Sequence, residues 1–274
     1  MLDQDRTSAQ IFAANRATGH IALAVAARGR RTQRSRVHEE GSLRVRFPHA
    51  EADALEAVIV NTGGGMTGGD RFAIDIALAE EASLIAGTAA AEKIYRSTEP
   101  DAEMNVRLTL AEGARLAWLP QETILFDRAR LSRRIEVDLA GSASLLLAEA
   151  VVFGRAAMGE AMRQGFFADR WRVRRAGKLV FADSARLNGA VADKLAAPAA
   201  AAGGIAIATV LVAPGDDATL AAVRAFDVAG EVGISCWNGI AVARLCAKDG
   251  AALRHDLIAL LAALKTPLPR LWLN

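Results

Sequence analysis

Two short segments hold the densest groups of charged and amide side chains in the sequence. The first is Glu92-Lys93-Ile94-Tyr95-Arg96, and the second is Gln121-Glu122-Thr123-Ile124-Leu125-Phe126-Asp127. Carboxylates and a lysine near strand ends could transfer protons as a general acid/base set, with Lys93, Glu122 and Asp127 as its members. A buried network of ion pairs between strands explains the same residues, because charges removed from water must be paired. Acid/base catalysis requires a geometry that spacing does not show, so we favour the network.

A glycine-rich segment runs from Asn61 to Asp70. Gly63, Gly65 and Gly68 have the G-x-G-x-x-G spacing of a dinucleotide-binding loop, but that loop leads into a helix whose N-terminus faces the phosphates. Here the following residues alternate with a period of two, which predicts a strand, and the lysine of a P-loop is missing. We therefore interpret the segment as a turn between two strands, in which Asn61 and Asp70 bond loop amides.

Residues that commonly bind metal ions are few and scattered along the chain. The four histidines are His20, His38, His49 and His255; none shares an i,i+4 or short-loop spacing with another, and no Cys-x-x-Cys exists. No zinc or nickel site can be read from this pattern, and each histidine is interpreted as an ordinary surface or partly buried residue. The only cysteines, Cys236 and Cys246, are interpreted as small buried hydrophobes in a reducing, cytoplasmic protein.

The elements that must position these residues are predicted mainly from periodicity. Alternation of apolar and polar residues with a period of two indicates strands over residues 43–47, 72–78, 104–110 and 135–139, and a hairpin over residues 171–181. One buried and one wet face is typical of antiparallel sheets. We therefore predict a mainly β protein, a large irregular body of many antiparallel strands without a convincing internal repeat.

The last third of the chain has a different pattern. Apolar spacing and acidic starts predict helices over residues 216–229 and 250–265, with a strand over residues 233–243 between them. The Ala-rich residues 196–204 are predicted to form a surface loop. The whole chain, residues 1–274, is thus interpreted as a single domain with a helical part at about residues 215–266.

Composition excludes several classes of protein. The 274 residues carry a net charge of +2, and 52% are hydrophobic but only 5% aromatic. This balance does not fit a strongly basic nucleic-acid binder, and no apolar run reaches the roughly 18–20 residues of a membrane span. The arginines at positions 28, 30, 31, 34 and 36 form a basic run, which is either a solvated edge or a surface for an anionic partner. No aromatic stacking platform for nucleic acid is interleaved with them.

Several of these motifs together resemble a known family. The glycine-rich segment, Ala91-Glu-Lys-Ile-Tyr-Arg-Ser97, Trp118-Leu-Pro-Gln-Glu-Thr-Ile-Leu-Phe-Asp127 and Gly154-Arg with Gly159-Glu160 follow the order of signatures in urease accessory protein D, also called H. The match covers roughly residues 40–190, and the ending Pro269-Arg270-Leu-Trp272 is also similar.

The resemblance implies a scaffold that is not an enzyme. Members of that family bind apo-urease and recruit two further accessory proteins, F and the nickel-carrying GTPase G, and a homodimer within the complex is a further expectation. The implied fold is an all-β body with a pair of helices. Nickel would be in transit through the protein, with no tightly bound cofactor. The family signatures near a passage or a partner surface correspond here to Asp70, Glu92, Lys93, Tyr95, Gln121, Glu122, Asp127, Glu149 and Glu160.

Overall fold

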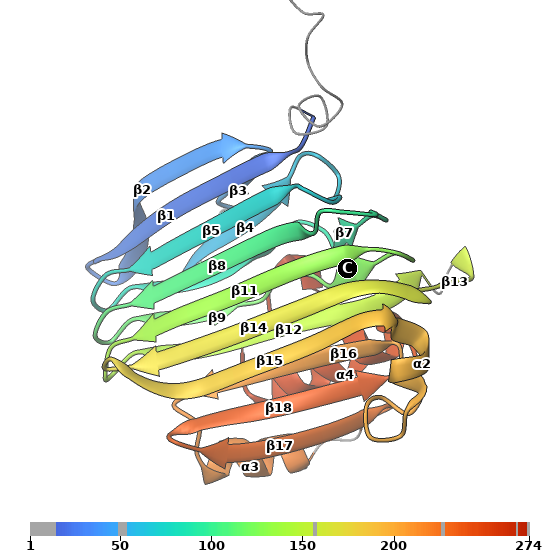
Figure 1. The fold of residues 1–274 in the computed structure, drawn as a ribbon. Coiled ribbons are helices and arrows are strands. Elements are labelled where there is room, and N and C mark those ends of the chain that lie inside the picture. The colour runs from blue at the N-terminus through green and yellow to red at the C-terminus, as the bar shows by residue number, and fades with distance from the viewer. Residues whose placement is uncertain (1–14, 49–53, 156–157, 226–227, 267, 273–274) are drawn as a thin grey trace, which may run out of the picture.

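The computed structural model describes residues 15–48, 54–155, 158–225, 228–266 and 268–272. His49 and residues 226–227 of the first predicted helix lie outside the described residues. Two large β-sheets and a small group of helices make up the described chain (Figure 1). The prediction of a mainly β protein with two longer helices in its last third is confirmed.

The first sheet has seven strands, and it faces the viewer in Figure 1. Its strands are β1 (Thr18–Arg28), β2 (Arg31–Gly41), β5 (Arg71–Leu78), β8 (Ala102–Leu110), β11 (Arg130–Leu139), β14 (Gln164–Arg175) and β15 (Lys178–Ala190). Their spatial order is β15-β14-β11-β8-β5-β1-β2.

The second sheet has eleven strands, of which eight form a continuous path. These eight are β3 (Leu43–Arg46), β4 (Leu55–Asn61), β6 (Ser83–Thr88), β9 (Arg115–Trp118), β12 (Ser144–Arg155), β16 (Ala206–Ala213), β17 (Glu231–Trp237) and β18 (Ile240–Ala247). Their order is β17-β18-β16-β12-β9-β6-β4-β3, and three short strands join this path at one side: β7 (Glu92–Ile94), β10 (Thr123–Leu125) and β13 (Glu160–Ala161).

The central strands of both sheets are parallel. From β4 to β14 the chain passes alternately between the sheets, so β5, β8, β11 and β14 run in one direction, as do β4, β6, β9 and β12. The prediction of antiparallel strands is therefore wrong for this coil, but it is right for the strands that flank the coil: β1–β2 and β14–β15 in the first sheet, and β3–β4, β12–β16, β16–β18 and β17–β18 in the second. Alternating hydrophobicity reports that one face of a strand meets water, and it carries no information about the direction of the neighbouring strand.

A repeated turn links the two sheets on one side of the coil. The turns begin at Ala79, Ala111 and Ala140, and each is closed by a bond from the backbone N–H of an alanine three residues later to the first alanine's carbonyl, at 3.2 Å in all three. The three closing alanines are fully buried. This structural repeat has only a weak counterpart in the sequence, where an A-x-x-A motif recurs after 32 and 29 residues. Four residues are too short a signal to be distinguished from the Ala-rich composition.

Two hydrophobic cores hold the layers together. The larger lies between the sheets and is built from inward-facing Ile, Leu, Val and Phe side chains of both. The smaller lies between the other face of the second sheet and α4 (Gly250–Ala263). Alanines such as Ala148, Ala208 and Ala243 cover the sheet side of this core, and their small size lets the leucines of α4 approach closely.

The C-terminal elements correct two predicted boundaries. Asp216 caps α3 (Asp217–Arg224) and Asp249 caps α4, so both helices begin where predicted, although α3 ends five residues earlier. The predicted strand over residues 233–243 is instead the hairpin of β17 and β18, with its turn at residues 238–239. The hairpin over residues 171–181 is confirmed as the β14–β15 turn.

Smaller features complete the chain. The short helix α2 (Val191–Ala196) precedes the Ala-rich loop, and a 3₁₀ turn (Arg270–Trp272) follows α4. Both cysteines are free and only half-buried, so they are less enclosed than predicted. Among the described residues, no helix has the length and apolar character needed to cross a membrane.

Candidate functional site

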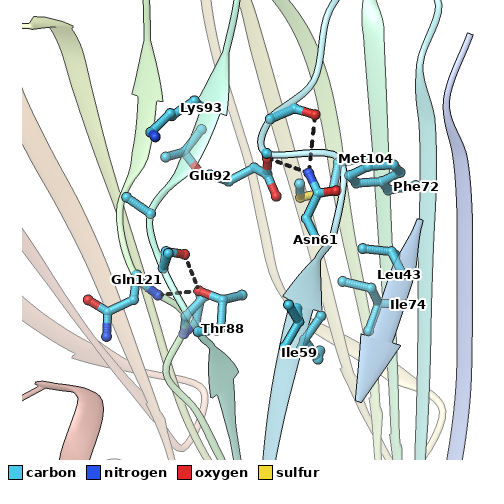
Figure 2. Close-up of a pocket in the computed structure, with 18 of the residues that line it drawn as sticks. Leu43, Ile59, Asn61, Phe72, Ile74, Thr88, Glu92, Lys93, Met104 and Gln121 are labelled. Carbon is cyan, nitrogen blue, oxygen red and sulfur yellow. Dashed lines mark hydrogen bonds between the residues drawn. The ribbon is translucent and has the colours of Figure 1, made fainter. Parts of the chain in front are cut away.

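A cavity of about 140 Å³ lies between the two sheets, beside the glycine-rich segment (Figure 2). Its apolar walls come from the inner faces of both sheets, including Phe72 and Met104 from the first and Ile59 and Trp118 from the second. Polar residues also line the cavity: Asn61, Thr88, Glu92, Lys93, Gln121, Thr123 and Glu149. The cavity therefore combines a mainly apolar lining with a few polar oxygen and nitrogen atoms, as small-ligand sites do.

Glu92 is one of two carboxylates at this cavity. The side-chain amide of Asn61 donates to Glu92 Oε1 at 2.9 Å and to the Gly65 carbonyl at 3.1 Å, so it ties the carboxylate to the glycine-rich segment (Figure 2). Burial raises the pKa of Glu92 from 4.5 to about 7 despite this bond, and the negative charge of Asp70 adds to the rise. At neutral pH the group is therefore divided between its protonated and charged forms.

Glu149, the second carboxylate, belongs to a buried ionic triad that joins the two sheets. Trp118 Nε1–H donates to Glu149 Oε1 at 2.8 Å, and Arg133 Nη1 donates to Oε2. The same guanidinium donates to both oxygens of Asp169, at 3.0 and 2.6 Å. Burial opposes the charge on Arg133, but Asp169 and Glu149 outweigh it and raise the pKa of the guanidinium. One cation thus faces two carboxylates, and burial raises the pKa of Glu149 despite Arg133 and Trp118.

Gln121 and Glu122 connect the cavity region to the C-terminal end of the chain. Arg254 of α4 donates to Gln121 Oε1 at 2.7 Å and to Glu122 Oε1 at 2.9 Å. Its other terminal nitrogen donates to the carbonyls of Leu271 and Trp272, and the guanidinium lies over the Trp272 ring. These two predicted site residues therefore anchor the helix and the chain end, and only Gln121 also lines the cavity.

Asp70 and Tyr95 hold the glycine-rich segment in place. Asp70 is buried and accepts from the backbone N–H groups of Ala17 at 2.8 Å and Thr67 at 2.7 Å. Tyr95 donates its hydroxyl to the Gly64 carbonyl at 3.0 Å. The interpretation of this segment as a turn between two strands is confirmed, because β4 precedes it and β5 follows it.

Asp127 and Glu160 lie together in a second loop region. Asp127 accepts from the backbone N–H groups of Arg163 and Gln164, at 2.7 and 3.1 Å. Glu160 pairs with Arg155 and accepts from the backbone N–H of Asp127. Both carboxylates thus stabilise the connection from β12 to β14.

The structure brings together only part of the predicted set. Glu92, Lys93, Gln121 and Glu149 line one cavity, whereas the lining does not include Asp70, Tyr95, Glu122, Asp127 or Glu160. The acid/base set of Lys93, Glu122 and Asp127 is not assembled, because each residue has a different environment.

Sequence reasoning missed two of the arginines that organise this region, Arg133 and Arg254. A signal for Arg133 was present, because it occupies an inward-facing position between Leu131 and Ile135 on β11. A charged residue at a buried position of an alternating strand predicts a buried ion pair. No comparable signal marks Arg254, whose partners are 17 to 133 residues away along the chain.

Fold and site together define a two-sheet, coil-like β protein that encloses a small, mainly apolar cavity lined by two carboxyl groups and carries helices on one sheet. The chain belongs to the UreD urease accessory protein family, whose model matches residues 17–273. Urease accessory protein UreD of Rhodopseudomonas palustris strain HaA2 is 57% identical over 267 residues, which cover 96% of both chains. Urease accessory protein UreD 3 of Bradyrhizobium sp. strain BTAi1 is 55% identical over 275 residues, 99% of both chains. The UreD of Bradyrhizobium diazoefficiens is 55% identical over 269 residues, 97% of this chain and 98% of its own.

Proposed function

We propose that this protein is a scaffold for urease maturation. It binds apo-urease and recruits the accessory proteins F and G, of which G is the GTPase that carries nickel, and a homodimer forms within this complex. The observation that carries the proposal is the family match over nearly the whole chain. We further propose that the cavity beside Glu92 is part of a route for nickel, which is cargo and not a resident cofactor.

The chemistry of the cavity supports transit better than storage. The described residues that line it offer carboxylate, amide and hydroxyl oxygens, and no thiolate or imidazole is among them. Soft thiolates and imidazoles hold nickel tightly, whereas oxygen donors hold it weakly and let it move on. Because the pKa of Glu92 is about 7, its carboxyl group can exchange a proton for a cation at neutral pH without a large cost.

The alternative is a small-molecule enzyme that uses Lys93, Glu122 and Asp127 as acid/base groups. General acid/base catalysis requires its groups within hydrogen-bond reach of one substrate. Here Glu122 is paired with Arg254, Asp127 is bonded to two backbone amides, and Lys93 is on the cavity wall. This dispersal favours the scaffold.

Co-purification tests the scaffold. The full chain with an affinity tag would be co-expressed with the urease subunits and with the accessory proteins F and G. We expect a complex that contains urease and at least one accessory protein after gel filtration. Absence of both from the purified material would overturn the scaffold proposal.

Nickel loading tests the route separately. Glu92→Gln keeps an acceptor for Asn61 but removes the exchangeable charge, so we expect urease matured with this variant to contain less nickel while co-purification is unchanged. The matched control is Glu103→Gln on β8, because its side chain is 46% exposed, does not line the cavity and lies 3.8 Å from Arg71. Full nickel loading with Glu92→Gln would refute the route but leave the scaffold intact.

A further inference from the structure

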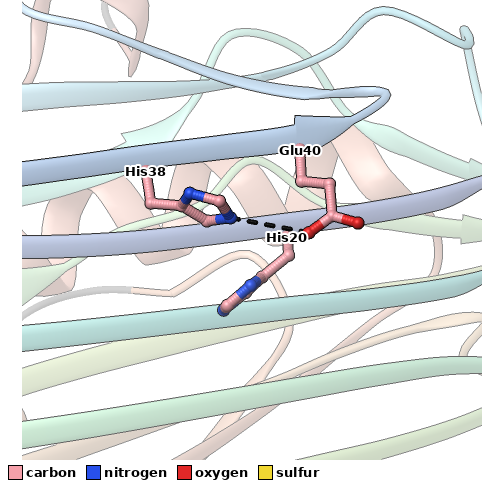
Figure 3. A group of neighbouring side chains, drawn as sticks. All are labelled: His20, His38 and Glu40. Carbon is pink, nitrogen blue, oxygen red and sulfur yellow. Dashed lines mark ion pairs between the residues drawn. The ribbon is translucent and has the colours of Figure 1, made fainter.

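The β1–β2 hairpin brings two distant histidines together on the outer face of the first sheet (Figure 3). The register pairs His20 with Glu40 and Ala22 with His38, so the three polar side chains are neighbours on one face. One nitrogen of each ring and one oxygen of Glu40 all lie within 4.8 Å of one another. The alternate residues of β1, such as Ile21 and Leu23, are buried on the inner face, which places this group on the opposite side of the sheet from the cavity.

A carboxylate of the next strand fixes one of the two rings. Asp75 of β5 lies 2.8 Å from His20 Nε2 through its Oδ2, and its Oδ1 is 3.4 Å from Arg107 Nη1. The His20 and His38 rings meet edge to face, with centroids 5.4 Å apart. A histidine that binds a metal ion is typically oriented in this way by a carboxylate. His20 is therefore held in position, although its side chain remains 35% exposed.

We propose that His20, His38 and Glu40 bind one divalent late transition-metal ion, of the class of Zn²⁺ or Ni²⁺, at the protein surface. Two imidazoles and a carboxylate form a donor set that these ions prefer and that Mg²⁺ does not. Water completes the coordination. The site is separate from the proposed nickel route in the cavity and does not depend on it.

The distances are compatible with a site that closes around the ion. Metal–ligand bonds of 2.0–2.1 Å in a tetrahedral site place the donor atoms about 3.3 Å apart. Because the side chains of His38 and Glu40 are 46% and 66% exposed, small rotations can bring the donors from their present separation to that distance without disturbing the core. Glu40 already lies 3.5 Å from His38 Nε2, and the ion would replace this contact (Figure 3).

Metal titration of single-histidine variants tests the proposal. Isothermal titration of the purified full chain with Zn²⁺ or Ni²⁺, in excess Mg²⁺, is expected to show a site with micromolar affinity. His20→Ala and His38→Ala should each weaken that site by at least about tenfold, and Asp75→Asn should weaken it by a similar factor. The matched control is His255→Ala, because the His255 side chain is 74% exposed and its Nδ1 lies 3.3 Å from the carboxylate of the neighbouring Asp256. Equal affinities of the His20→Ala, His38→Ala and wild-type proteins would overturn the proposal.

A second measurement locates the ion. Substoichiometric Ni²⁺ is paramagnetic and broadens the NMR signals of the imidazoles that bind it. We expect the His20 and His38 signals to broaden before that of His255, and the same result with Glu92→Gln, which would separate this site from the cavity. Broadening of His255 first would refute the assignment. Far-UV circular dichroism of each variant verifies the fold, because none of these substitutions removes a side chain of the hydrophobic cores.

Discussion

The pKa of Glu92 leads to a prediction about stability that does not require any partner protein. Burial of this carboxyl group disfavours its charged form in the folded state, and the unfolded chain does not share that cost. Between the ordinary pKa of 4.5 and the folded value of about 7, the folded protein binds more protons than the unfolded chain. The contribution of Glu92 to stability is therefore fully present below pH 4.5 and is lost as the pH rises through 7.

Glu92→Gln should remove this dependence, because glutamine is neutral at every pH. A shift of about 2.5 pH units corresponds to a limiting difference of about 3 kcal/mol. We expect the variant to exceed the wild type in free energy of unfolding by about 1 kcal/mol at pH 5, about 2 at pH 6 and about 3 at pH 8. Urea unfolding followed by tryptophan fluorescence at each pH measures these differences, since the chain has four tryptophans.

Glu112→Gln provides a control of opposite sign. The Ser142 hydroxyl and the backbone N–H groups of Ser142 and Gly141 donate to Glu112 and lower its pKa. Glu112 therefore stabilises the protein above pH 4.5 and loses this effect as the pH falls, so the variant should be less stable at neutral pH and approach the wild type in acid. A difference for Glu92→Gln that does not change with pH would refute the reasoning about Glu92.

Two further substitutions test the packing around the site. Gly68→Ala should destabilise the protein by about 1–3 kcal/mol, because its new methyl group would collide with the Ser97 side chain and the Pro100 carbonyl. The control is Gly233→Ala, because Gly233 has open space around it. Equal urea midpoints for the two variants would contradict this explanation. Arg133→Met should cost about 3–5 kcal/mol, since it leaves two buried carboxylates unpaired. Adding Glu149→Gln and Asp169→Asn to Arg133→Met removes both unpaired charges and should restore much of the lost free energy of unfolding. An Arg133→Met variant as stable as the wild type would disprove the role of the triad.

Periodicity predicted the strands β3, β5, β8 and β11, the β14–β15 hairpin and both longer helices. The order of apolar and polar residues along a short segment is enough to predict the buried face of a strand or helix. Caps such as Asp216 and Asp249 mark the starts of helices independently of tertiary structure. The glycine-rich turn was also predicted, because the strand pattern directly after Asp70 excludes a nucleotide-binding helix. These features depend on the immediate neighbours of each residue.

Features that depend on the path of the chain were not predicted. Parallel pairing follows from the alternation of the chain between the two sheets. The sequence of a single strand does not indicate which strand lies beside it. His20 and His38 are 18 residues apart, and only the β1–β2 register, including its irregularity near Ala24, places them together. The candidate site was predicted in part for the same reason: Glu92 and Glu122 were both identified as polar site residues, but only Glu92 lines the cavity, because Glu122 is paired with Arg254 of α4.

The stacked A-x-x-A turns set a rule for how the coil can change in length. Each turn bonds to the next through backbone groups, as from Arg115 N–H to the Ala82 carbonyl and from Ser144 N–H to the Ala114 carbonyl. Gain or loss of a whole unit of about 30 residues would leave these backbone hydrogen bonds between successive turns aligned. A single inserted residue inside a unit would reverse the inward and outward faces of the strand that follows. Natural length variation within the central coil should therefore occur in whole units, with small insertions confined to the loops opposite these turns.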